Sequence, residues 1–231
     1  MRIQRLEVTN SRSGSPPVEL RGKLEQGVQA LRLTLAAMQI EALLNYLALI
    51  QKWNQVYNLS AVRDPQAMLV RHLLDSLAVL SPLRKQAPLA NRLLDVGSGA
   101  GLPGVVLAIA FPKLEVTCLD AVAKKSAFVQ QVAGALNLPN LHALHGRVEM
   151  LRPATGKAWD LICSRAFASL ADFVVGSQNA LAPGGVWMAM KGKLPQDEMQ
   201  ALPADVEVFH VEQIQVPQLD ARRCLVWMRR H

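Results

Sequence analysis

Residues 93–104 contain the residue types best suited to holding a ligand. They read LLDVGSGAGLPG, so an apolar run leads into four glycines within eight residues. Glycine adopts left-handed backbone conformations and has no Cβ that would keep a ligand away from the main chain. In open parallel sheets, the turn after the first strand faces the crevice in which ligands bind. The spacing therefore predicts a ligand-binding turn between a strand and a helix, the alternative being a tight turn without a ligand.

Two kinds of cofactor fit this turn. The last three glycines satisfy the G-x-G-x-x-G pattern of dinucleotide-binding proteins, and Asp120 follows at the end of the next predicted strand. A carboxylate there can bind the vicinal ribose hydroxyls of NAD or of S-adenosylmethionine. Asp95 favours S-adenosylmethionine, because its carboxylate could serve the cationic amino-acid end of that molecule. The bulk of Leu102 and Pro103 favours it too, because a dinucleotide needs room for a pyrophosphate at the helix N-terminus.

Residues 91–231 alternate strand-forming runs with helical ones, which predicts a doubly wound α/β domain. Strands are expected at Arg92–Val96, Glu115–Leu119, Leu141–His145, Asp160–Ser164, Val186–Lys191, Glu207–Gln213 and Leu225–Arg229. Helices are expected at Lys124–Leu136 and Leu170–Leu181. The segment Val216–Arg223 is too short for a crossover helix, so the last two strands should form an antiparallel hairpin. This is the arrangement of seven-stranded S-adenosylmethionine-dependent methyltransferases, a Rossmann-like fold.

The preceding residues 18–90 are predicted to form an N-terminal helical segment. Apolar residues recur there at three- and four-residue steps, at Ile40, Leu43, Leu44, Leu47 and Ile50. Asp64 as an N-cap and Pro65 at the first helical position predict a helix start, and Pro82 is expected to end that helix. Residues 1–17 are polar, with Ser, Gly and Pro clustered at their end, which indicates a disordered extension.

Composition narrows the class of protein. Hydrophobic residues make up 51% of the 231 residues, enough for a packed core. The longest apolar run, Val105–Phe111, is far too short to cross a membrane, and no secretory leader pattern follows Met1. The three widely spaced cysteines are expected to be buried thiols in a reducing compartment. We therefore expect a cytoplasmic protein, and the spacing of His, Cys and Asp predicts no metal site.

The charge balance allows a nucleic-acid partner. The chain has 25 Lys and Arg against 18 Asp and Glu, a formal net charge of +7, with most of the surplus in residues 1–90. Such a surplus attracts polyanions at long range. It is equally typical of a surface that is kept soluble by its charge.

Five motifs resemble, in the same order, those of the bacterial ribosomal RNA small subunit methyltransferase G family, also called glucose-inhibited division protein B. They are WNQVYNL at 53–59, RHLLDSL at 71–77, DVGSGAGLPG at 95–104, RVE at 147–149 and SRAFASL at 164–170. The similarity extends from about residue 31 to residue 226. Family members transfer a methyl group from S-adenosylmethionine to N7 of a guanine in 16S ribosomal RNA. The resemblance implies this activity, this cofactor, and 16S ribosomal RNA or the small ribosomal subunit as the partner.

The resemblance also implies where the cofactor binds. The family's contacts fall on Gly97, Leu102, Val148, Glu149 and Arg165. Asp120 fits the ribose-binding role by its position alone, and Gly99 belongs to the same glycine turn.

Methylation of guanine N7 needs no general base, because N7 carries a lone pair and no proton. Alignment with the methyl donor is sufficient, so no catalytic acid or base is predicted. The N7 edge of paired RNA lies in a groove too deep and narrow for side chains, so the base must be unpaired or flipped out. Residues predicted to bind the RNA backbone are Arg63, Arg71, His72, Arg165, Lys191, Lys193 and Arg223. Trp53 and Tyr57 share a helix face and could stack on a base or anchor the helix to the sheet.

Two other functions stay open. One is an NAD-dependent oxidoreductase, which depends on the glycine pattern. The other is a non-catalytic RNA-binding module of ribosome assembly that has kept the fold. The intact glycine turn and Asp120 argue against the non-catalytic module, because a cofactor site that is no longer used would be expected to lose these residues first.

Overall fold

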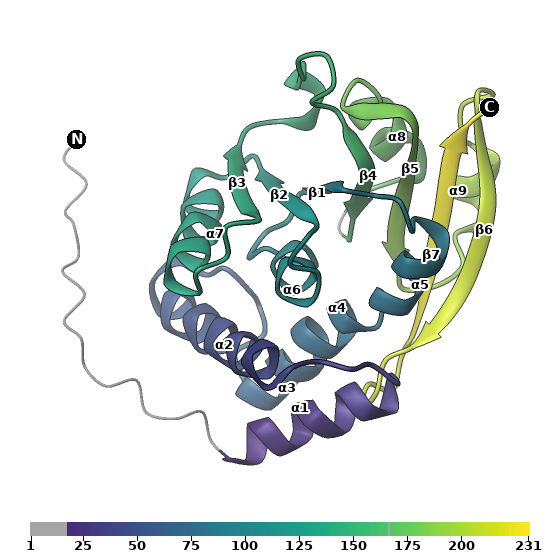
Figure 1. Ribbon diagram of the computed structural model, residues 1–231. Coiled ribbons are helices and arrows are strands. Elements are labelled where there is room, and N and C mark those ends of the chain that lie inside the picture. The colour runs from purple at the N-terminus through teal and green to yellow at the C-terminus, as the bar shows by residue number, and fades with distance from the viewer. Residues whose placement is uncertain (1–17, 166) are drawn as a thin grey trace, which may run out of the picture.

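A computed structural model describes residues 18–165 and 167–231 (Figure 1). Within them, seven strands form one sheet in the order β3-β2-β1-β4-β5-β7-β6. The strands are β1 (Arg92–Val96), β2 (Glu115–Asp120), β3 (Leu141–His145), β4 (Trp159–Ser164), β5 (Leu181–Lys191), β6 (Val206–Gln215) and β7 (Arg222–Arg230). Strands β1 to β5 pair in parallel, and β7 is antiparallel to both β5 and β6. The doubly wound sheet with an antiparallel C-terminal hairpin is confirmed.

Helices precede the sheet and connect its strands. Those before it are α1 (Val18–Ala30), α2 (Ala37–Tyr57), α3 (Pro65–Met68), the π-helix η1 (Leu69–Leu74), α4 (Asp75–Leu77) and α5 (Leu80–Gln86). Those between strands are α6 (Gly104–Ala110), α7 (Ala123–Ala135), the 3-10 helix η2 (Val148–Met150), α8 (Leu170–Ser177) and α9 (Gln196–Gln200). Figure 1 shows α2, α6 and α7 gathered on one side of the sheet, and α8 away from them.

Alternate strand residues enter two hydrophobic clusters, one on each face of the sheet. Leu93 and Leu161 join the larger cluster, which includes residues of α1, α2, α6 and α7. Leu94 and Ile162 join the smaller cluster, which includes residues of α8. Successive side chains of a strand point to opposite faces, so apolar strands such as β1 are buried on both sides. The helices of residues 18–90 thus share one core with the sheet.

The predicted helix start at Asp64 is confirmed, and the predicted helix end at Pro82 is wrong. The Asp64 Oδ2 accepts a hydrogen bond from the Ala67 backbone N at 2.7 Å, which caps α3. Pro82 lies in the first turn of α5 and is buried. Proline is tolerated there because the N–H that it lacks would have no partner within the helix.

The helix predicted at Leu170–Leu181 is shorter than expected. It ends at Ser177, and Leu181 begins β5 opposite Trp159 of β4. Pairing with β4 therefore draws the end of the predicted helix into the sheet. The predicted disordered extension, residues 1–17, lies outside the described residues.

Tyr46 of α2 fastens the N-terminal helices to the glycine turn. Its side chain is fully buried, and its hydroxyl donates a hydrogen bond to the carbonyl oxygen of Ala100 at 2.6 Å. Burial raises the pKa of Tyr46 well above its usual value, so the hydroxyl keeps the proton that it donates. The turn is thus held from the helical side as well as from the sheet.

Replacing Tyr46 by phenylalanine should lower the free energy of unfolding by about 1–3 kcal/mol, because the Ala100 carbonyl loses this donor in a buried place. Urea denaturation followed by circular dichroism measures the change. Tyr57→Phe is the matched control, since Tyr57 is exposed. Equal stability of the two variants would show that the Tyr46 hydroxyl does not hold the turn.

Candidate functional site

Two carboxylates near the ends of neighbouring strands hold the glycine turn. Asp95 of β1 is 0% exposed, and its Oδ2 accepts a hydrogen bond from the Gly104 N–H at 2.8 Å. Asp120 ends β2 and is 6% exposed. Its two oxygens accept from the N–H groups of Gly99 and Val122, each at 2.9 Å. The turn is therefore tied to the sheet at its middle and at the start of α6.

The first two glycines of the turn leave open space for a ligand. Gly97 and Gly99 have φ values of +68° and +60°, and no neighbouring atom lies within 4 Å of a Cβ built on either. At Gly101, by contrast, a Cβ would lie 2.4 Å from the Val105 side chain. Gly101 is thus needed for packing, whereas Gly97 and Gly99 have open space beside their backbone, and Gly97 lines a cavity.

A cavity of about 320 Å³ opens at this turn. Four predicted cofactor residues line it, together with Phe167 of the loop after β4: Gly97, Asp120, Val148 and Glu149. Carboxylate oxygens can accept more than one hydrogen bond each, so Asp120 can still accept from ribose hydroxyls. The exposed glycine backbone, the carboxylate and the apolar Val148 fit a nucleoside such as that of S-adenosylmethionine.

Three predicted cofactor residues, Gly99, Leu102 and Arg165, lie outside the cavity lining. The Gly99 N–H binds the Asp120 carboxylate, which does line the cavity. Leu102 is 3% exposed and packs its side chain into the larger hydrophobic cluster, which leaves only its backbone for a cofactor. Arg165 directly follows β4, and its Nη1 donates a hydrogen bond to the carbonyl oxygen of Arg71 at 3.2 Å. It also lies 3.5 Å from the Asp75 Oδ2, as an ion pair.

Asp75 contacts two predicted site residues, and the sequence analysis did not single it out. It is 2% exposed, and its Oδ1 accepts a hydrogen bond from the Arg223 Nε at 2.8 Å. Arg165 and Arg223 thus share one buried carboxylate, which joins the helical segment to β4 and β7. The sequence feature that could have pointed to Asp75 is the presence of an acidic residue among the leucines of RHLLDSL.

The prediction that His72 binds RNA is wrong. His72 is 5% exposed, and its Nε2 lies 2.8 Å from the Ser60 Oγ. Desolvation lowers the pKa of His72, so the imidazole is held neutral. The burial leaves almost none of the ring accessible to a phosphate.

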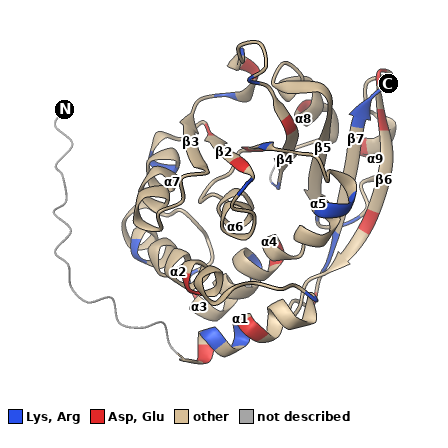
Figure 2. Cartoon of the chain, in the orientation of Figure 1, with Lys and Arg blue, Asp and Glu red and all other residues tan. Residues whose placement is uncertain are grey.

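The other predicted RNA-binding residues divide into paired and open side chains. Lys191 forms an ion pair with Glu198 at 2.7 Å, and Arg63 donates a hydrogen bond to Asn58 at 3.1 Å. Arg71 and Lys193 are exposed. Figure 2 shows that basic residues also lie on α1, α5 and β7, at separate places on the molecule.

Trp53 anchors α2 to the rest of the fold. Its ring packs edge-on against Phe128 of α7, with ring centroids 5.4 Å apart, and it also contacts Tyr57 at 5.1 Å. The anchoring interpretation of this aromatic pair is therefore favoured over base stacking.

All three cysteines are free and buried, as predicted. Across residues 18–165 and 167–231, no group of three or more His, Cys, Asp or Glu side chains is placed to hold a metal ion. In the same part of the chain, no helix is long and apolar enough to cross a membrane.

Sequence comparison finds one family of proteins. The family model described as GidB, rRNA small subunit methyltransferase G, matches residues 39–226. A protein of Methylibium petroleiphilum named ribosomal RNA small subunit methyltransferase G is 60% identical over 208 residues, covering 90% of this chain and 93% of its own. The protein of the same name from Acidovorax ebreus is 58% identical over 215 residues, covering 89% and 93%.

Structural comparison finds methyltransferase folds. TrmN from Thermus thermophilus aligns with a TM-score of 0.53 and 20% identity, over 71% of this chain and 53% of its own. A SAM dependent methyltransferase from Aquifex aeolicus aligns with a TM-score of 0.51 and 18% identity, over 71% of this chain and 93% of its own. The predicted seven-stranded fold of S-adenosylmethionine-dependent methyltransferases is confirmed.

Gly99→Val should abolish S-adenosylmethionine binding in a folded protein, because the branched side chain would fill the open space beside the turn. Isothermal titration calorimetry measures the affinity, and circular dichroism checks the fold. Gly156→Val is the matched control: Gly156 also has a positive φ, of +73°, and no atom within 4 Å of a built Cβ. Both variants carry backbone strain, but only Gly99→Val should lose the cofactor. A folded Gly99→Val protein with normal affinity would contradict the site.

Stability should depend on pH through Asp95. Burial is the main cause that raises the pKa of Asp95 to about 7, and the hydrogen bond from Gly104 opposes it. The folded chain therefore binds more protons at Asp95 than the unfolded chain, so the free energy of unfolding should fall as pH rises from about 4 to about 7. Asp95→Asn should flatten this fall in urea denaturation series, whereas Asp197→Asn, at an exposed carboxylate of α9, should not. Parallel pH profiles for Asp95→Asn and the wild type would refute the assignment.

Proposed function

The chain belongs to the ribosomal RNA small subunit methyltransferase G family, and from this premise we propose that it methylates N7 of a guanine in 16S ribosomal RNA with S-adenosylmethionine as the donor. The observation that carries the proposal is the cavity at the glycine turn, which brings together four of the residues that the family resemblance assigns to the cofactor or that fit it by position. A ribosomal substrate also favours a cytoplasmic location.

S-adenosylmethionine supplies a methyl group bonded to a positively charged sulfur. In this chain, the bare backbone of Gly97 and Gly99 and the carboxylate of Asp120 would hold it, with Val148 and Glu149 at the cavity wall. The fold and the family both support this cofactor.

The residues around the cavity orient the reactants and do not need to move a proton. Guanine N7 reacts through its own lone pair, so alignment lowers the barrier without a general base. Neither Asp95 nor Asp120 is needed to accept a proton in this reaction. Both carboxylates instead accept hydrogen bonds that hold the glycine turn. The proposal therefore assigns no catalytic acid or base.

RNA would be bound by cations along the same edge of the sheet. Arg71 and Lys193 are exposed there, and the pair Arg165 and Arg223 leaves one positive charge in excess over Asp75. The family assignment favours a methyltransferase over an NAD-dependent oxidoreductase. The intact glycine turn favours an enzyme over a non-catalytic assembly module.

Labelled S-adenosylmethionine and small ribosomal subunits that lack the modification test the proposal directly. The label should appear on one guanine of 16S ribosomal RNA, as 7-methylguanine in the digested product. A label on protein, on another base or on another atom of guanine would overturn the proposed substrate, and no transfer to RNA would overturn the proposed activity.

The double variant Arg71→Ala/Lys193→Ala should bind a ribosomal RNA fragment more weakly while S-adenosylmethionine affinity stays unchanged. Each phosphate contact releases counterions, so the slope of log K against log salt should decrease by about 0.7–0.9 per contact removed. Filter binding at several salt concentrations measures this slope. Lys85→Ala/Lys113→Ala is the matched control, because both lysines are exposed on segments that lead into the opposite edge of the sheet. Equal slopes for the two double variants would place the RNA on another surface.

A further inference from the structure

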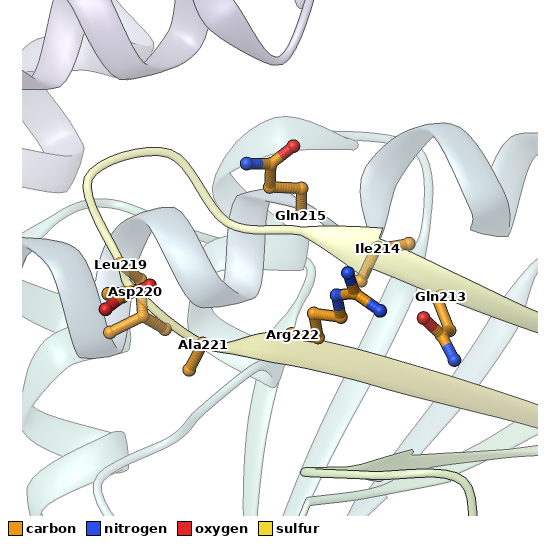
Figure 3. A pocket seen from close by; sticks show the side chains of 7 residues that line it. All are labelled: Gln213, Ile214, Gln215, Leu219, Asp220, Ala221 and Arg222. Carbon is orange, nitrogen blue, oxygen red and sulfur yellow. The ribbon is translucent and has the colours of Figure 1, made fainter.

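The β6–β7 end of the sheet carries a hollow that is separate from the cofactor cavity. It has a volume of about 580 Å³ and is lined by Gln213–Gln215 of β6 and by residues 219–222, which lead into β7 (Figure 3). A second hollow of about 470 Å³ shares Leu219 and Asp220 with it and reaches Arg71. The loop that carries Asp220 thus lies between two open concave surfaces.

The register of the hairpin places polar side chains on one face of this hollow. Gln215 of β6 lies opposite Arg222 of β7, and Gln213 lies opposite Cys224. Opposed residues of an antiparallel pair project to the same face, so Gln213, Gln215 and Arg222 share a face. All three are exposed, and within the described residues none of the three side chains makes a hydrogen bond. The two amides therefore offer both donors and acceptors to a ligand.

The hollow lies at the edge of the sheet where the cofactor cavity opens. Strand β5 is parallel to β4 and ends at Lys191, opposite Cys224 near the start of the antiparallel β7. The Lys191 Nζ lies 3.5 Å from the carbonyl oxygen of Phe167, which lines the cofactor cavity. At a strand spacing of about 4.8 Å, β6 lies about 14 Å from β4. A short stretch of extended RNA spans that distance.

The chemistry of the hollow suits a nucleobase better than a phosphate. Arg222 is its one cationic lining residue and exposed Arg71 lines the adjoining hollow, whereas the other polar side chains of its lining are two amides and the carboxylate of Asp220. A carboxylate repels phosphate and accepts hydrogen bonds from N–H groups. In protein–nucleic acid interfaces, phosphate contacts position the chain and polar side chains read base edges. Unpaired RNA bases present those edges to side chains.

We propose that this hollow binds one unpaired base of the RNA substrate, near the guanine that is methylated. Asp220 accepts a hydrogen bond from an exocyclic amino group, Gln215 binds the rest of the base edge, Gln213 contacts the neighbouring nucleotide, and Arg222 contacts the adjoining phosphate. The inference rests on the proposed function, because it takes ribosomal RNA as the substrate. It adds a specificity-determining subsite away from the reacting atoms.

The test compares Gln213→Ala/Gln215→Ala with Gln130→Ala/Gln131→Ala, a matched pair of exposed glutamines on α7. The first variant should lose between about 5-fold and about 100-fold in affinity for a 16S ribosomal RNA fragment that contains the methylated guanine. It should lose a similar factor in kcat/KM on unmodified small subunits. S-adenosylmethionine affinity and the salt slope should stay as in the wild type, because base contacts release no counterions.

Arg222→Ala is the complementary variant, and its salt slope should decrease by about 0.7. Asp220→Asn should weaken binding of the fragment without changing the slope. If the glutamine variant binds the fragment as tightly as its control, the subsite is refuted. A loss seen with assembled subunits but absent with the fragment also refutes it, since a ribosomal protein would then be the contact. Failure of the wild type to methylate subunits would instead overturn the proposed function.

Discussion

The candidate site depends on the hydrogen bonds that two buried carboxylates accept from the glycine turn, because these bonds hold the turn in place. Burying a carboxylate is costly, and the turn offsets part of that cost by supplying the Gly104 N–H to Asp95 and the Gly99 N–H to Asp120. The turn has left-handed backbone at Gly97, Gly99 and Gly101, and the space beside Gly97 and Gly99 is open. Because Tyr46 holds the same turn from the helical side, the cofactor cavity is shaped by the sheet and the N-terminal helices together.

Asp75 joins the helical segment to two of the predicted site residues, Arg165 and Arg223. Its carboxylate takes Arg165 from the end of β4 and Arg223 from the start of β7, so three distant parts of the chain meet at one buried acid. A single carboxylate shared by two guanidinium groups sets their positions and leaves one positive charge in excess. The helices of residues 18–90 therefore position cations at the sheet edge as well as covering its hydrophobic face.

The antiparallel direction of β7 decides what lies beside the cofactor cavity. In a wholly parallel sheet, the residues that begin the last strand would lie at the opposite edge, far from the glycine turn. Because β7 runs against β5, Arg222 and Arg223 lie beside the end of β5 at Lys191. Strand β6 then ends at the same edge of the sheet. The hollow at Gln213 and Gln215 and the cofactor cavity therefore lie along one edge. One edge of the sheet can thus serve both the methyl donor and an RNA chain.

The sequence by itself determined the elements and the family. Hydrophobic period, glycine spacing and the cap at Asp64 act over a few residues, so strands, helices and the ligand-binding turn could be predicted from local pattern. The family motifs supplied the rest of the cofactor residues. Only the tertiary structure decided which side chains meet: Asp75 pairs with arginines 90 and 148 residues away, and His72 becomes buried and neutral. Strand order and helix packing bring such groups together, and neither the distance nor the burial is encoded in any short segment.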